Sequence, residues 1–441
     1  MGERPVVTGI AMLAITVLMI FGGPVPDVAA TILLAATGLA LLGALAFTEW
    51  SAALRAQPLA FRFGLLGIAL LPLLQIVPLP PSLWHALPGQ ALRIQTLTLA
   101  GLADSWQPLS VTPLFTAGAV VVAIGFVALL MLLLTLPAQD LRRIAWLVLA
   151  LVVLNILIGL VQVASGGQAL QFYRAADHGA LIGFFANKNH AALVLAASLP
   201  IAAYLLGSRE HPEGARTWLG LYAGVVLVAL VTTNSRAGVG FGLVTVLLLG
   251  SLYVRAIKPV YVVAIAAAAI AGLVLLSTTS AFEQVFNRFN DVNEDLRWQY
   301  LWTSRPLIER YWLLGSGIGS FSTLYAVGES LAWVKPTLVN QLHDEYPQLL
   351  LEAGLPGIAL LLAIVGGVIW RGARVWTQGA RNHRLPLLCG ALILVLIAVH
   401  SGVDYPLRRP AVLPILALAM ILVIRGDLTA STGLVRRKHK A

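Results

Sequence analysis

Long apolar stretches separated by short polar segments run along almost the whole chain. Most approach the 20 or so apolar residues that a helix needs to cross a bilayer. A period of two is absent, so the pattern predicts helices rather than barrel strands. The predicted spans are 6–22, 28–46, 61–79, 112–136, 144–164, 189–207, 217–234, 237–254, 259–278, 350–370, 386–402 and 410–425. The expected fold is an all-α polytopic membrane protein with about twelve transmembrane helices in one membrane domain, residues 1–441.

Composition excludes a soluble protein. Of the 441 residues, 59% are hydrophobic and 11% are charged, whereas about a quarter of the residues of a globular domain are charged. The single cysteine, Cys389, excludes an internal disulfide and a cysteine-based metal cage.

The positions of the cations predict the orientation. With the N-terminus inside, 18 of the 29 Lys and Arg residues fall inside, and 6 of the 19 acidic residues do. This distribution satisfies the positive-inside rule and predicts that both termini are cytoplasmic. The net charge of +10 is therefore a topology signal and does not indicate a nucleic-acid partner. The long outside segments are 80–111 and 279–349, the second being a large periplasmic loop with short helices.

Four polar clusters are predicted to lie on the outer face, where polar groups at the membrane edge carry information about function. The first contains Tyr173, Arg174, Asp177 and His178, and it continues through Gly183 to His190. Asn187 or Asn189 is expected to cap the next helix. The helix N-terminus, with Lys188 and Arg174 beside it, is also a natural site for an anion. Both interpretations remain open.

The second cluster, Thr232 to Gly238, separates two apolar helices by a very short turn. Arg236 lies in this turn at the edge of the bilayer. Its side chain either extends to lipid head groups or binds a phosphate in a polar pocket, since a guanidinium suits bidentate phosphate binding.

The third cluster runs from Arg288 to Phe321. Arg297, Tyr300 and Ser304 share one helical face, and Trp298, Trp302 and Arg305 share another. The aromatic residues, with Trp312, are expected to anchor the helix at the membrane interface or to stack on sugar rings. Gly315, Gly317 and Gly319 predict a tight turn, because the strand-then-helix setting of a nucleotide-binding loop is absent.

The fourth cluster is His343, Asp344 and Glu345. An imidazole beside a carboxylate can accept a proton from a hydroxyl. A smaller group of similar residues follows, consisting of His400, Ser401, Asp404, Tyr405, Arg408 and Arg409. The spacing lacks HExxH, which disfavours zinc, and GxSxG is absent, which disfavours a serine hydrolase.

These clusters, taken in order, resemble the O-antigen ligase and polymerase superfamily over about residues 170–410. The resemblance rests on Gly183 to His190, Asn234 to Gly238, Arg297 through the glycine turn, and the His343 segment. His343 and Gly354 have the spacing of the ligase pattern, but Asp344 stands where that pattern usually has Asn, Ser or Gln.

The resemblance implies a multi-pass enzyme of the bacterial inner membrane that needs no metal and no cofactor. It would transfer a glycan from an undecaprenyl diphosphate carrier to a hydroxyl on the periplasmic side. The expected partners are this donor, a lipid A-core or glycan acceptor, and membrane lipids.

For the mechanism, the catalytic residues are expected to be His343, as general base, and Arg236. Asp344 or Glu345 would orient His343, and Asn187 and Asn189 would support the site. The residues expected to bind the lipid diphosphate are Arg174, Lys188, Arg236, Arg297 and Arg305, and those expected to bind sugar are Trp298, Tyr300, Trp302 and Trp312.

Two alternatives remain. A polymerase would use another carrier-linked repeat unit as acceptor, and the His-to-Gly spacing favours a ligase over it. A secondary transporter is a different class. Transporters carry charged residues near the membrane midplane on repeated, broken helices, and neither feature is visible in this sequence.

Overall fold

The computed structural model describes residues 4–23, 28–173, 177, 179–206, 214–253, 296–329, 338–379 and 383–425. Within these residues, seven helices are long and apolar enough to cross a membrane. They are α1 (Arg4–Phe21), α4 (Leu59–Ile76), α7 (Pro113–Thr135), α8 (Ala138–Ala164), α9 (Lys188–Leu206), α16 (Glu345–Gln378) and α17 (Arg384–Ser401). Shorter apolar stretches lie in α2 (Val28–Leu45), α10 (Ala215–Thr232) and α11 (Arg236–Tyr253), and in the segment that ends with α18 (Leu413–Arg425).

Eleven of the twelve predicted spans coincide with these helices, and the twelfth, 259–278, lies outside the described residues. The largest differences are at helix ends. α8 begins at Ala138 rather than 144, and α16 covers Glu345–Gln378 rather than 350–370. A helix can continue beyond the apolar stretch into the polar interface, where charged residues such as Arg142 are tolerated.

The connections add short elements. These are α3 (Trp50–Arg55), β1 (Pro78–Leu79), α5 (Pro81–Trp84), α6 (Ala91–Leu99), β2 (Gln107–Pro108), α14 (Leu296–Tyr311), α15 (Phe321–Gly328), and the 3₁₀ turns η4 (Pro406–Arg408) and η5 (Pro410–Val412). β1 and β2 pair antiparallel and close the α5–α6 segment into a loop, a small departure from the all-α prediction. Arg93 fixes this loop by donating to the carbonyl of Pro108 at 2.8 Å.

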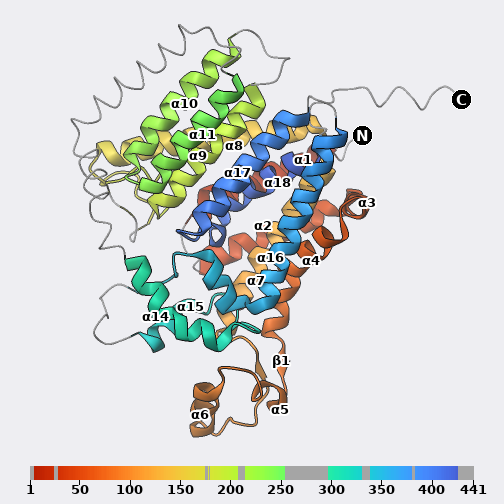
Figure 1. Cartoon of the computed structure of the whole chain (residues 1–441), viewed down its shortest axis with the longest axis vertical. Coiled ribbons are helices and arrows are strands. Elements are labelled where there is room, and N and C mark those ends of the chain that lie inside the picture. The colour runs from red at the N-terminus through yellow and green to blue at the C-terminus, as the bar shows by residue number, and fades with distance from the viewer. Residues whose placement is uncertain are drawn as a thin grey trace, which may run out of the picture.

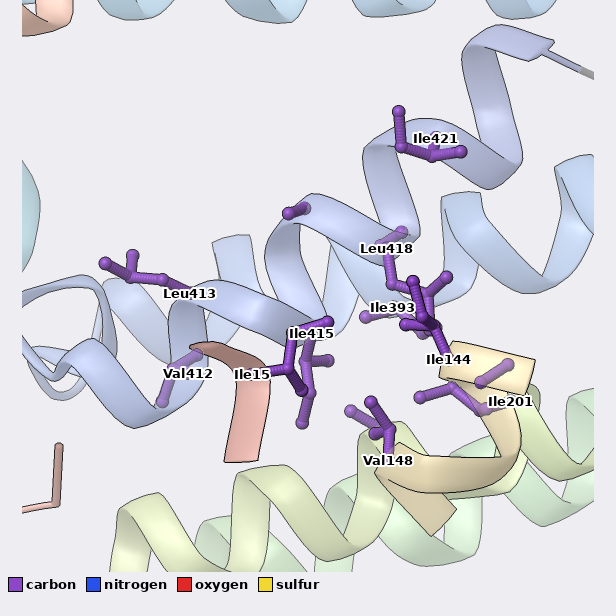
Figure 2. Packing of buried hydrophobic residues seen from close by; sticks show 14 of the residues in the cluster. Ile15, Ile144, Val148, Ile201, Ile393, Val412, Leu413, Ile415, Leu418 and Ile421 are labelled. Atoms are coloured by element: carbon purple, nitrogen blue, oxygen red, sulfur yellow. The ribbon is translucent and has the colours of Figure 1, made fainter. Parts of the chain in front are cut away.

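The core lies where the last helix crosses its neighbours. In Figure 2, Ile415 and Leu418 of α18 approach Ile15 of α1, Ile144 of α8 and Ile393 of α17. Each of these five side chains is buried. The first and last helices of the described chain are therefore packed into one core.

Helix ends gather at two opposite sides of the bundle. On one side the backbone nitrogen of Ala411 donates to Gly22, and that of Leu181 donates to Thr232. On the other, Thr8 donates to Asp140, and Arg371 donates to the carbonyl of Ile424 at 2.9 Å. We call the first the site end. α14 and α15 lie there, with α5 and α6 farther out (Figure 1).

Candidate functional site

His343 ends an extended segment just before α16. Its backbone is left-handed, with φ of 61°, a conformation that is uncommon for residues other than glycine. Its Nδ1 lies 3.2 Å from Oδ1 of Asp404, and its side chain is 24% exposed. With an ionised carboxylate as acceptor, Nδ1 carries the hydrogen and Nε2 has a lone pair. Nε2 has no hydrogen-bond partner within the described part of the chain. The ring can therefore take a proton from a ligand.

Asp404 is the centre of the polar contacts at the site end, and it is fully buried. Its Oδ1 accepts from the backbone nitrogen of Tyr405 at 3.0 Å and lies 3.6 Å from Nε2 of His190. Its Oδ2 accepts from Nδ2 of Asn189 at 2.7 Å. Burial opposes ionisation, but the hydrogen bonds and charges of His190 and His343 outweigh it and hold the pKa of Asp404 well below its ordinary value. Asp404 is therefore a carboxylate at neutral pH.

The start of α9 joins the first two predicted clusters. Asn187 caps this helix, because its Oδ1 accepts from the backbone nitrogen of Asn189 at 2.7 Å. Asn189 points elsewhere, accepting from Oγ of Ser235 at 2.8 Å while it donates to Asp404. Ser235 directly precedes Arg236, the first residue of α11. One amide thus links the α10–α11 turn to the carboxylate beside His343.

The segment before α9 is anchored on α8 by two buried amides. Gln162 accepts from the backbone nitrogen of Gly183 at 2.8 Å, and Asn155 accepts from that of Phe184 at 2.8 Å. Gly183 is left-handed, and a Cβ there would lie 2.1 Å from Oδ1 of Asn155. Only glycine lets the backbone come this close to Asn155. The close contact holds the segment that leads into α9.

The two carboxylates next to His343 in sequence have other partners, so the expectation that one of them orients His343 is corrected. Asp344 caps α16, accepting from the backbone nitrogen of Tyr346 at 3.1 Å. Burial raises its pKa, opposed by that hydrogen bond. Glu345 accepts from the backbone nitrogen of Leu407 at 2.9 Å and lies 3.2 Å from Nε of Arg408. In the structure, the carboxylate that contacts His343 is Asp404.

A buried ion cluster supports this arrangement. Nη1 of Arg408 lies 2.7 Å from Oε2 of Glu352. Burial would lower the pKa of Arg408, but the charges of Glu352 and Glu345 raise it above its usual value. Oε1 of Glu352 accepts from the backbone nitrogen of Phe321 at 3.1 Å. The cluster ties η4 to α16 and to the start of α15.

The glycine run forms the predicted tight turn. Gly315, Gly317 and Gly319 have φ of 82°, 104° and 90°. The turn packs against a break in α16, where Gly354 has φ of 61°. The break leaves the carbonyl of Glu352 free to accept from Nε2 of Gln75 at 2.9 Å. The backbone nitrogen of Gly317 donates to the carbonyl of Glu352 at 3.0 Å. The turn therefore supports the residue that pairs with Arg408.

α14 presents two different faces, as its periodicity predicts. Tyr300 is half-buried and stacks on His343 with 6.1 Å between ring centroids, and Arg297, also half-buried, is close enough to His400 to act on its charge. Trp298 and Trp302 are 67% and 64% exposed on the other face. Arg305 is exposed there too and pairs with Glu309 at 2.7 Å. Of the predicted ligand-binding residues on α14, the structure brings Arg297 and Tyr300 to the site.

The structure shows other surroundings for two of the remaining predicted residues and does not describe the third. Nζ of Lys188 is 3.6 Å from Asp177, and Trp312 is exposed just after α14. Arg174 lies outside the described residues. The described residues contain no group of three or more His, Cys, Asp or Glu side chains arranged to hold a metal ion.

Three residues at the centre of the site were not among the predicted site residues: Asp404, His190 and Tyr405. Tyr405 places its ring 4.7 Å from His343 and 4.9 Å from His190, edge to face. The sequence did contain a hint for two of them. His400, Asp404 and Tyr405, between the last two helices, repeat the residue types found at His343.

Part of the chain matches a known protein family. Residues 221–362 match the family model described as O-antigen ligase. The match begins in α10, ends in α16 and includes Arg236, Arg297 and His343, whereas Asn189 and Asp404 lie outside it. No curated protein matches the chain.

Proposed function

Residues 221–362 are an O-antigen ligase domain within a multi-pass membrane protein, and from this we propose that the protein transfers a glycan from undecaprenyl diphosphate to an acceptor hydroxyl. The family comprises membrane enzymes that ligate or polymerise O-antigen, which act on lipid-linked glycans. The observation that carries the proposal is the contact between His343 and the buried carboxylate of Asp404, at the bundle end to which Arg236 and Arg297 also belong.

In the proposed reaction, Nε2 of His343 accepts the proton of the acceptor hydroxyl. The oxygen attacks the anomeric carbon, the bond from that carbon to the diphosphate oxygen breaks, and the diphosphate leaves with the electron pair. Attack opposite the leaving group inverts the configuration. Asp404 holds the ring and stabilises the imidazolium that forms.

Arginines stabilise the charge that grows on the leaving diphosphate. We assign this role first to Arg236, which follows Ser235 of the Asn189 network, and to Arg297 on the inner face of α14. Arg174, Lys188 and Arg305 are secondary candidates, because Lys188 and Arg305 already pair with acidic side chains. Tyr300 is the aromatic residue best placed for the transferred sugar.

The acceptor is proposed to be lipid A-core, on the basis of the spacing from His343 to Gly354. A polymerase acting on carrier-linked repeat units is the second candidate, since the family includes both activities. A deletion strain distinguishes them. Loss of attachment with long carrier-linked chains indicates a ligase, whereas single repeat units on the core indicate a polymerase.

The decisive experiment is transfer in vitro from purified lipid-linked glycan, comparing the wild type with His343→Ala. General-base catalysis contributes about 10²–10⁴-fold, so we expect a loss of that order. Near-normal transfer by His343→Ala would refute the assignment of the base. Activity should persist in EDTA, and its loss would refute the metal-independent mechanism.

A further inference from the structure

Two adjacent arginines at the site end are in opposite electrostatic situations. Arg408 is neutralised by Glu352 and Glu345. Arg409 is 4% exposed, yet no carboxylate of the described chain lies within ion-pair distance of it. Burying a cation is costly unless an opposite charge or hydrogen bonds compensate for it. Because no acidic side chain of the described residues neutralises Arg409, we expect a ligand to supply the opposite charge.

The neighbours of Arg409 fix its position beside the proposed base. Its guanidinium lies 4.8 Å from the ring centroid of Tyr405, a cation–π contact. The same ring lies 4.7 Å from His343. Burial raises the pKa of the Tyr405 hydroxyl, while Arg409 and Asn187 act on it in the opposite direction. Arg409 and His343 therefore contact the same aromatic ring.

A buried guanidinium held in this way suits a phosphate. It stays charged, and its planar donors match two oxygens of a phosphate group. A helix N-terminus adds backbone dipoles that favour an anion, and α9 begins next to Asn187. The acidic side chains that would compete are occupied: Asp404 by His190, His343 and Asn189, and Glu345 by Arg408.

We propose that Arg409 binds a phosphate group of the lipid-linked donor, next to His343. This inference rests on the proposed function for the identity of the ligand. It adds a cation that lies outside residues 221–362 and that the sequence pattern did not assign to the diphosphate. Arg409 would bring the diphosphate within one ring of the base, so the anomeric carbon lies near the hydroxyl that His343 deprotonates.

The test is binding of undecaprenyl diphosphate to the purified full-length protein in detergent. Hydrogen bonds to charged groups justify an expected loss of affinity of about tenfold or more in Arg409→Gln. Arg409→Lys keeps the charge but loses the bidentate geometry, and it should bind with intermediate affinity. The matched control is Arg310→Gln, an exposed arginine of α14, which should bind as the wild type does.

Three results would overturn the inference. The first is wild-type affinity in Arg409→Gln. The second is equal competition by phosphatidylglycerol, which would make the site one for lipid head groups. The third is an unfolded Arg409→Gln together with wild-type affinity in Arg409→Lys, which would make Arg409 structural.

Transfer by His343→Ala is measured in parallel, and its outcome is independent of the binding result. No glycan transfer by the wild type, together with weakened binding in Arg409→Gln, refutes the proposed function and leaves a phosphate site. An inactive His343→Ala with unchanged binding in Arg409→Gln refutes only the assignment of Arg409.

Discussion

Asp404 illustrates how a buried charge is made tolerable. Its carboxylate accepts from the Asn189 amide, the Tyr405 backbone and the His343 imidazole, with Nε2 of His190 a further 3.6 Å contact, and these contacts compensate for the lost hydration. The same contacts keep it ionised, which fixes the hydrogen of His343 on Nδ1. The contacts that stabilise the buried carboxylate therefore also determine which nitrogen of His343 carries the proton.

Replacing Asp404 by Asn should remove this control while keeping the size of the side chain. An amide nitrogen turned toward His343 would favour the wrong tautomer, so we expect transfer to fall by about 10²-fold. Asp344→Asn is the matched control: Asn caps a helix about as well as Asp, so both thermal stability and turnover should stay near those of the wild type. Rates of glycan transfer for the two variants check this. A larger loss of turnover in Asp344→Asn would restore Asp344 as the orienting group.

At the scale of elements, the junction between the glycine turn and the break in α16 is the most constrained part of the site end. A Cβ at Gly317 would lie 2.2 Å from Oγ of Ser110, and one at Gly315 would lie 2.3 Å from the carbonyl oxygen of Glu352. The turn, the segment before α7 and α16 therefore meet with no space for side chains. A change in any one of them is transmitted to the buried pair of Glu352 and Arg408.

Gly317→Ala should consequently destabilise the protein. A left-handed backbone costs an L residue roughly 1–2 kcal/mol, and the overlap with Ser110 adds to that. Gly250→Ala is the matched control, since Gly250 lies in α11 with open space around it and alanine favours a helix. Thermal denaturation in detergent should show a lower midpoint for Gly317→Ala alone. Equal midpoints would mean that the turn tolerates a side chain.

The sequence predicts elements better than their mutual arrangement. Hydropathy located the helices because apolar length is a local property, and a period of 3.6 separated Tyr300 from Trp298 on α14. Which face turns inward could not be deduced, since both carry aromatic and cationic residues. The partner of His343 was missed for a related reason. Asp404 is 61 positions away, and the nearer Asp344 is turned by helix capping toward Tyr346.

At the scale of the whole molecule, the contacts place polar clusters from distant parts of the chain at one end of the bundle. Asn189, Ser235, His343 and Asp404 come from four segments, yet they form a connected network. The cation distribution predicts that this end faces the periplasm. The structure shows the two ends of the bundle, and the charges predict the compartment that each end faces.

This assignment predicts opposite labelling of two engineered cysteines. The native Cys389 is fully buried and can be replaced by Ala to give a background without cysteine. In that background, Asp104→Cys, on the exposed α5–α6 loop, should react with an impermeant maleimide in intact spheroplasts. Thr377→Cys, exposed near the end of α16, should react only after lysis. The reverse pattern would invert the topology and place the site in the cytoplasm.

The late position of Asp404 in the chain has a consequence for biosynthesis. Chains emerge from the ribosome N-terminus first, so Asn189 and Ser235 can meet early, while His343 must wait for a residue beyond α17. A nascent chain that has inserted α16 already contains the proposed base, His343, but not Asp404, the carboxylate that contacts it. The pair of His343 and Asp404 is therefore complete only after the last two helices have packed against the first, where the backbone nitrogen of Ala411 donates to Gly22. Under the proposed function, an unfinished chain therefore does not consume lipid-linked glycans while it is being made.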